Sequence, residues 1–179
     1  MANFVQRMIG AATLNVPVVE EIEADTEYTV PALGVVVLAS IAAAVGGFAE
    51  GGVQAAGVLL VSSLFGWVFW AFMTWLIGTK ILPTPDTKSD MGELLRTMGF
   101  AQSPGLLRVF GGIPLLGSIV NWVVMIWLLV AMIVAVRQSL DYKSTLRAVV
   151  VVGIGWILNC IIFLAAMSIV GIGGMIAGS

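Results

Sequence analysis

Four long runs of apolar residues, none interrupted by a charged side chain, constrain this chain more than any other feature of its sequence. They cover Val30 to Phe48, Val53 to Gly78, Ile119 to Val136 and Ala148 to about Met175. The hydrocarbon core of a bilayer is about 30 Å thick, and a helix needs about 20 residues to cross it. In lipid the backbone must satisfy its own hydrogen bonds, so helices are favoured over strands despite the many Val and Ile residues. The sequence therefore predicts an all-α integral membrane protein.

The titratable side chains exclude most catalytic chemistry. The chain has no histidine and a single cysteine, Cys160, which rules out Ser-His-Asp and Cys-His catalysis, histidine-ligated haem or zinc, and an internal disulfide. Paired carboxylates, a nucleophile with a base, and a phosphate-binding loop cannot be assembled from the other residues. A formal net charge of -2 gives no basic field for nucleic acid. We therefore expect no enzyme, no metal site and no cofactor.

The stretch from Gly99 to Ser118 decides the number of spans. It contains Arg108, two prolines and five glycines, and its uncharged part, residues 109–118, is only ten residues long. If this stretch stays in a loop, the Lys and Arg residues divide between the two membrane faces. If it crosses, all eight lie on one face, and Glu50 is the only charge on the other. The positive-inside tendency favours the crossing, so we predict a bundle of five transmembrane helices, the third short or bent, with a cytoplasmic amino terminus and an external carboxyl terminus.

Two amphipathic segments are expected outside the spans. Residues 1–29 are predicted to be a cytoplasmic amino-terminal segment with a helix from Asn3 to Ala11, a break near Pro17 and a hydrated acidic connector. Residues 30–179 then form a single five-span membrane domain. In the loop after the second span, Asp90 and Glu93 have the spacing of a capping box. We expect a helix there that ends at Gly99 as its C-cap and lies flat on the membrane surface.

Five side chains are the candidate lipid or partner contacts. Arg108 is expected to reach back to the cytoplasmic interface and bind lipid phosphates or helix-end carbonyls, with an anionic ligand or partner as the alternative. Asn121 and Asn159 are expected to form hydrogen bonds between helices. Trp75 suits the aromatic belt at the cytoplasmic interface. Trp70 lies deeper in the second span, where it can pack against other helices or contact a lipid tail, a quinone or a pigment.

Part of the chain resembles a known family. The residues from Gly92 to Leu107 (GELLRTMGFAQSPGLL), the run from Ile113 to Gly117 (IPLLG) and the pair Ile126-Trp127 resemble the core of the Yip family, the Ypt-interacting multi-pass membrane proteins, in its bacterial-type branch. A basic entry to the last span, from Lys143 to Ala148, extends the resemblance over most of residues 30–170. The resemblance implies five spans and a cytoplasmic amino terminus. Eukaryotic members bind Rab-type GTPases and shape early secretory membranes, but the short amino-terminal region of this chain argues against GTPase binding.

As function, we predict a non-catalytic multi-pass membrane protein with a scaffolding or membrane-organising role. Its partners would be the lipid bilayer and a membrane protein or complex, and its location would be the inner (plasma) membrane of a bacterial cell. Two alternatives stay open. One is an accessory subunit of a larger respiratory or photosynthetic membrane complex. The other is a small-solute transporter or channel, against which the lack of an internal repeat and of a polar midplane site argues.

Overall fold

A computed structural model describes the backbone of residues 3–177 and the side chains of residues 3–47, 57, 60–162 and 164. The described chain consists of helices joined by short turns and loops. The helices are α1 (Phe4–Ala12), α2 (Val16–Ala24), η1 (Thr26–Tyr28), α3 (Thr29–Gly46), α4 (Phe48–Leu76), the π-helical turn η2 (Ile77–Ile81), α5 (Met91–Phe100), the 3₁₀-helix η3 (Ser103–Gly112), α6 (Gly117–Ser139) and α7 (Thr145–Ala177).

Four helical segments in the described chain are long and apolar enough to cross a bilayer. They run from Thr26 to Gly46, from Leu60 to Ile81, from Gly117 to Ser139 and from Thr145 to Ile162. The prediction of an all-α membrane bundle is thereby confirmed. The expected third span is not among these four segments, because residues 91–112 are divided between a short α-helix and a 3₁₀-helix. Glu50 is predicted to be the only charge on the face opposite the Lys and Arg residues, but its side chain lies outside the described residues.

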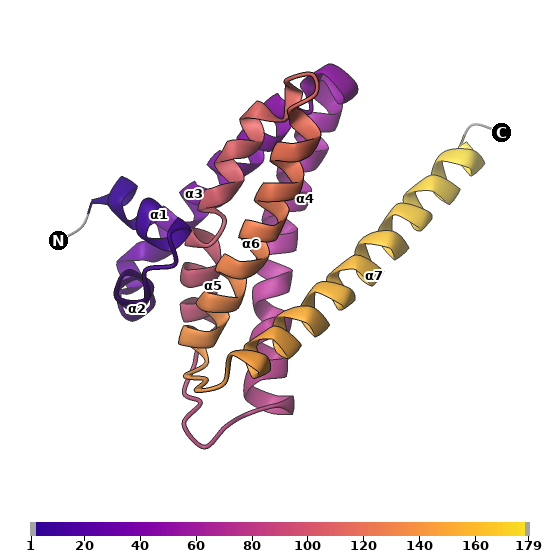
Figure 1. The fold of residues 1–179 in the computed structure, drawn as a ribbon. Helices are drawn as coiled ribbons and strands as arrows, with labels where there is room; N and C mark the ends of the chain where they lie inside the picture. Colours follow the sequence, from indigo (N-terminus) through magenta and orange to yellow (C-terminus); the bar gives the residue numbers. More distant parts are fainter. Residues whose placement is uncertain (1–2, 178–179) are drawn as a thin grey trace.

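The α5–η3 segment runs alongside α3 for nearly the whole length of that helix. A methyl group built on Gly99 would come within 2.8 Å of Ala32 Cβ, and one built on Gly105 within 3.2 Å of Ala39 Cβ. Further along, Gly112 faces the carbonyl oxygen of Gly46, the last residue of α3. Figure 1 shows this segment rising to the same end of the molecule as the turn between α3 and α4. We call this end the top.

The opposite end, which we call the base, is formed by two loops that touch each other, residues 82–90 and residues 140–144. The Thr87 hydroxyl donates to the Leu140 carbonyl over 3.1 Å, and Lys143 pairs with Asp86 at 2.6 Å. The guanidinium of Arg147 donates to the Pro83 carbonyl at 3.2 Å. These contacts join the end of α4 to the turn between α6 and α7.

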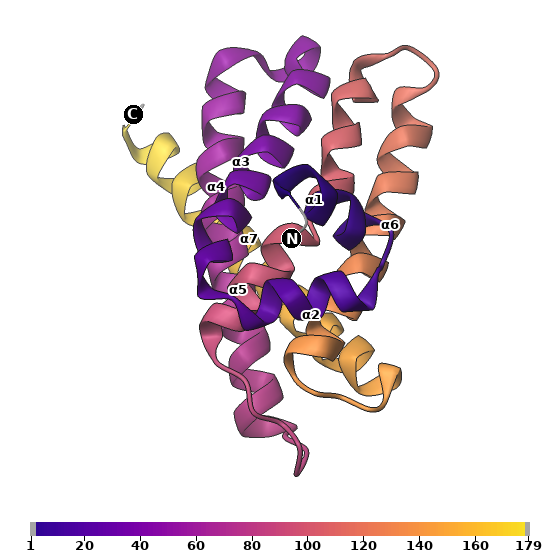
Figure 2. The ribbon, with the colours of Figure 1, turned by 90° about the vertical axis from the view of Figure 1, so that its left-hand side faces the viewer.

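The amino-terminal helices pack against the outside of the bundle. Figure 2 shows α2 lying crosswise to α6, with α1 above it. The expected helix near Asn3 to Ala11 is present as α1, and Asn3 and Gln6 form a capping box at its start. The acidic stretch keeps its carboxylates exposed or half-buried, but it is not a connector, because most of it is the helix α2, with Pro17 in its first turn and Val19 and Ile22 buried.

The capping box of Asp90 and Glu93 begins α5 as predicted. However, α5 does not lie flat on the surface. Leu94, Met98 and Phe100 have no exposed area, because α5 is surrounded by α2, α3, α4 and α6. Gly99 is not a C-cap either. It lies inside the helix, where the absence of a side chain lets α3 approach at Ala32.

Candidate functional site

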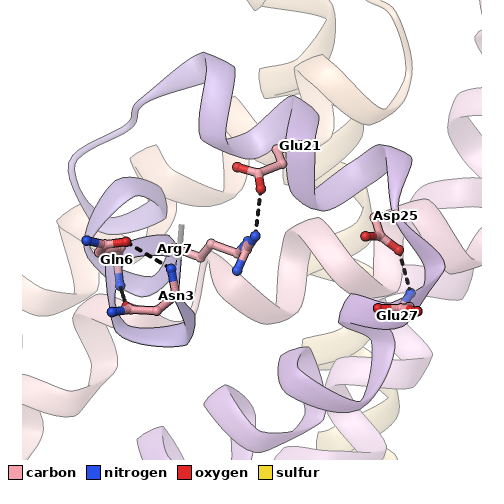
Figure 3. Close-up of polar contacts among 6 residues, drawn as sticks. All are labelled: Asn3, Gln6, Arg7, Glu21, Asp25 and Glu27. Carbon is pink, nitrogen blue, oxygen red and sulfur yellow. Dashed lines mark hydrogen bonds and ion pairs between the residues drawn. The ribbon is translucent and has the colours of Figure 1, made fainter. Parts of the chain in front are cut away.

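Arg7 fixes α1 to α2 through a half-buried ion pair. Its side chain is 7% exposed and lies 2.6 Å from a carboxylate oxygen of Glu21, and its guanidinium carbon lies 4.1 Å from the centre of the Tyr28 ring. Figure 3 shows Arg7 pointing from α1 towards α2, away from the Asn3–Gln6 capping box, with the bond from the Glu27 amide to Asp25 nearby. The only charged residue of α1 therefore faces the protein.

Side chains from the bundle bind the carboxyl ends of both amino-terminal helices. Trp127 of α6 donates its indole N–H to the Ala12 carbonyl at 2.7 Å. Arg96 of α5 is buried and donates to the carbonyls of Ile22 and Glu23, at 3.3 and 3.2 Å from Nε. The last carbonyls of a helix lack partners inside the helix and carry partial negative charge, so an indole N–H and a guanidinium are suitable donors. The two contacts hold α1 and α2 at fixed positions on the bundle.

The outer surface of α1 is apolar. Val5 and Ile9 are one helical turn apart and are 57% and 58% exposed, and we call these two residues the outer apolar face. On the same helix, Phe4 packs edge-on against Phe100 with 6.0 Å between ring centres. This polarity is the reverse of that of a helix on a water-soluble protein, because the charge is inside and the aliphatic side chains are outside.

A cavity of about 560 Å³ lies among the helices that form the spans. Its walls come from α3, α4, η3, α6 and α7, and most of its surface is apolar. The lining residues are Val36, Ala39, Ser40, Ala43, Ser63, Gly66, Trp67, Trp70, Gln102, Gly105, Arg108, Met125, Ile126, Leu128, Leu129, Met132, Trp156 and Asn159.

Three of the five candidate contact residues meet at this cavity. Arg108, Asn159 and Trp70 all line it. Asn159 Nδ2 also donates to the Gly66 carbonyl at 3.3 Å, a hydrogen bond between α7 and α4 of the kind expected from the sequence. The Trp70 indole nitrogen is buried without a hydrogen-bond partner and faces Gly155 of α7.

Asn121 and Trp75 lie elsewhere. Asn121 is exposed near the top, where its side-chain amide lies beside Gly111. Trp75 lies towards the base, where its indole donates to the Ser89 carbonyl at 3.2 Å and the Lys80 ammonium lies 5.7 Å from its ring centre. The cavity and the amino-terminal contacts also use Trp67, Arg96 and Trp127, which the sequence did not single out as site residues.

The position of Arg108 differs from the expected one. A methyl group on Gly46 would overlap the Arg108 carbonyl oxygen, so Arg108 lies beside the last turn of α3 and not near the base. The reason is the 3₁₀ conformation of η3, which rises about 2.0 Å per residue against 1.5 Å in an α-helix. The few residues between Gly99 and Arg108 thus carry the chain most of the way to the top.

Glu23 is the most perturbed acid outside the spans. Burial, together with the carboxylates of Glu93, Asp141 and Glu20, raises the pKa of Glu23 to about 7, against the opposite effect of the Arg96 guanidinium. Like charges and low polarity both disfavour an ionised carboxylate. Within the described part of the chain, no group of three or more Cys, Asp or Glu residues is placed to hold a metal ion.

The family model that describes the Yip1 domain matches residues 15–167. No curated protein and no solved structure matches the chain. The matched region begins in the turn before α2. It includes α5, η3 and all the residues named above as lining the cavity. The resemblance to the Yip family is therefore confirmed, without its bacterial-type branch, and the chain is a multi-pass membrane protein that belongs to the Yip1 domain family.

Proposed function

We propose that this protein is a non-catalytic membrane-organising scaffold that holds an amphipathic helix, α1, inside one leaflet of the bilayer. The bundle supplies a rigid base, α2 and the contacts of Arg96 and Trp127 position α1, and the outer apolar face occupies lipid. A helix inserted in a single leaflet takes up area on that side alone, which favours curvature.

The depth of α1 carries this proposal. Phe4 lies against Gly34 of α3 and Phe100 of α5, and the end of α1 is bonded to Trp127 of α6. Gly34 and Trp127 lie inside two of the membrane-spanning segments, Thr26–Gly46 and Gly117–Ser139. Val5 and Ile9 therefore face outwards at a level where the surroundings of the bundle are hydrocarbon or headgroup, as in interfacial helices.

Five crossings, with the base in the cytoplasm, complete the proposal. The two base loops touch, which is accounted for if the α5–η3 segment crosses between α4 and α6. Six of the eight Lys and Arg residues gather towards the base: Lys80, Lys88, Arg96, Arg137, Lys143 and Arg147. Positive charge favours the cytoplasmic face, so in this arrangement the amino terminus is cytoplasmic and the carboxyl terminus is outside.

The test is reconstitution of a Val5→Gln/Ile9→Gln double variant into liposomes, with vesicle shape measured by electron cryomicroscopy. Each of these half-exposed side chains contributes about 1 kcal/mol by leaving water for lipid. We expect the wild-type protein to produce smaller or tubular vesicles, and the double variant to leave vesicles like protein-free ones. The matched control is Ala24→Gln, which adds the same polar group at an exposed position of α2.

Equal vesicle shapes for the wild-type protein and the double variant, with both incorporated to the same extent, would contradict the proposal. A second contradicting result has two parts. The wild-type protein leaves vesicle shape unchanged, and a stoichiometric membrane-protein companion that co-purifies with the wild type is absent from the double variant. That second result would favour the accessory-subunit alternative, with the outer apolar face as the docking surface.

A further inference from the structure

We propose that the cavity between the spans is a binding site for one anionic phospholipid, whose phosphate contacts Arg108 and whose acyl chain lies against α6 and α7. This proposal does not depend on the role of α1. It rests on the unpaired donors in the cavity, on its opening and on its volume.

The first observation is a charge that no described carboxylate compensates. Arg108 lines the cavity, and the ion pairs among the described residues are Arg7–Glu21 and Lys143–Asp86, so Arg108 has no carboxylate partner there. A guanidinium within a membrane-spanning bundle is costly unless it is paired, and such residues mark functional sites. Its planar array of donors suits a phosphate group.

The second observation is a buried donor without an acceptor. Trp67 also lines the cavity, is 6% exposed, and has an indole nitrogen that is buried without a hydrogen-bond partner. An indole offers only a donor, and a buried polar group without a partner costs about 1–3 kcal/mol. Trp67 thus lacks an oxygen acceptor and Arg108 lacks an anion, so a ligand that serves both carries oxygen atoms and a negative charge.

The third observation is the route of entry. The cavity wall includes Met125, Ile126 and Leu129 of α6 and Trp156 of α7, and their side chains are 46%, 58%, 47% and 54% exposed. The cavity therefore opens sideways between these two helices. Figure 1 shows α7 diverging from α6 towards its carboxyl end, on the same side. An opening in the flank of a membrane bundle faces lipid, so the ligand comes from the bilayer and not from free phosphate in solution.

The cavity takes only part of a phospholipid, whose two acyl chains exceed its volume, so the rest of the lipid stays in the bilayer. About 560 Å³ lies in the range of 300–1,000 Å³ that is typical of small-molecule sites. The mostly apolar wall suits an acyl chain, and Arg108 offers the phosphate a cationic contact. Neutral phospholipids carry the same phosphate but also a choline or ethanolamine cation, which would place a second positive charge beside Arg108. This difference favours an anionic headgroup.

The experiment measures retained lipid by native mass spectrometry. Purified full-length protein is exchanged into detergent containing phosphatidylglycerol or phosphatidylcholine with identical acyl chains. We expect one tightly retained phosphatidylglycerol on the wild-type protein, about tenfold less retention for Arg108→Gln, and a smaller loss for Trp67→Phe, which removes the N–H and keeps most of the aromatic ring. Lys88→Gln, which removes the same charge from an exposed site in the base loop, is expected to retain lipid as the wild type does.

Three results would overturn the proposal. They are equal retention by folded Arg108→Gln, equal retention of phosphatidylcholine, and displacement of the bound lipid by millimolar inorganic phosphate. If Arg108→Gln does not fold, Trp67→Phe decides alone, and wild-type retention by that variant counts against the site. Arg108→Lys, which keeps the charge and loses the planar donor array, is expected to retain an intermediate amount.

Discussion

At the scale of single residues, the contacts that position α1 and α2 join distant parts of the sequence. Arg96 reaches Glu23 across 73 residues, and Trp127 reaches Ala12 across 115. Nothing in the local pattern around either residue indicates a bond to a helix end. By contrast, the capping boxes of Asn3 with Gln6 and Asp90 with Glu93 depend on residues three apart, so sequence reasoning can find them.

Glu23 leads to a prediction about pH. Its pKa is raised from 4.5 to about 7 by burial and by neighbouring carboxylates. The folded state thus holds a proton that the unfolded state releases above pH 4.5, and stability falls as the pH rises from about 4.5 to 7. We expect Glu23→Gln to be more stable than the wild type at pH 8, by about 1 kcal/mol after allowing for solvent screening. Thermal unfolding in detergent, followed by circular dichroism, measures this difference.

The same measurement at pH 4.5 should give equal unfolding temperatures for the wild type and Glu23→Gln. Glu27→Gln removes an exposed carboxylate three residues beyond α2 and is expected to follow the wild-type pH profile. A stabilisation by Glu23→Gln that is the same at both pH values would show that ionisation of Glu23 is not its cause.

At the scale of elements, α5 and η3 show what a sequence pattern can and cannot provide. The start and the apolar face of α5 follow from residue spacing alone. Its surroundings do not, because Thr97 is bonded to Ser139 of α6 at 2.7 Å and Gly99 is packed against α3. A helix with contacts on all sides has the same local pattern as one lying on a surface. For η3, the ten-residue 3₁₀-helix depends on glycine contacts with α3 that local propensity does not encode.

The contact between α3 and η3 gives the second prediction. A Cβ atom at Gly46 would overlap the Arg108 carbonyl, which belongs to backbone and cannot rotate away. We expect Gly46→Ala to lower stability by about 1–3 kcal/mol, the usual cost of overpacking. The readout is the midpoint of thermal unfolding in detergent. Gly153→Ala in α7 is the control, since a Cβ there meets no atom within 4 Å, and a similar loss in both variants would refute the close approach.

At the scale of the whole molecule, the arrangement of charge and the path of the chain agree. The base holds most of the Lys and Arg residues, and the loops at its centre are linked by the pairs Lys143–Asp86 and Arg147–Pro83. From the number of charges on each side of the membrane alone, the sequence analysis predicted that these Lys and Arg residues lie on one face. It placed Arg108 near the cytoplasmic start of the third span, with its side chain reaching back to the interface, whereas the backbone has already reached the end of α3 at that residue.

The number of crossings provides the last prediction, and three serines distinguish four from five. Ser89 and Ser144 lie in the two base loops, and Ser118 lies at the start of α6 near the top. Each is replaced by cysteine in a Cys160→Ala background and treated in intact cells with a thiol reagent that does not cross membranes.

With five crossings, Ser118→Cys reacts from outside, whereas Ser89→Cys and Ser144→Cys react only after the membrane is permeabilised, because the two base loops share the cytoplasmic face. With four crossings, Ser89→Cys and Ser118→Cys would behave alike and Ser144→Cys would differ from both. The Cys160→Ala protein alone is the control for background labelling. Opposite labelling of the two base loops would contradict the contact between Thr87 and Leu140 as well as the fifth crossing.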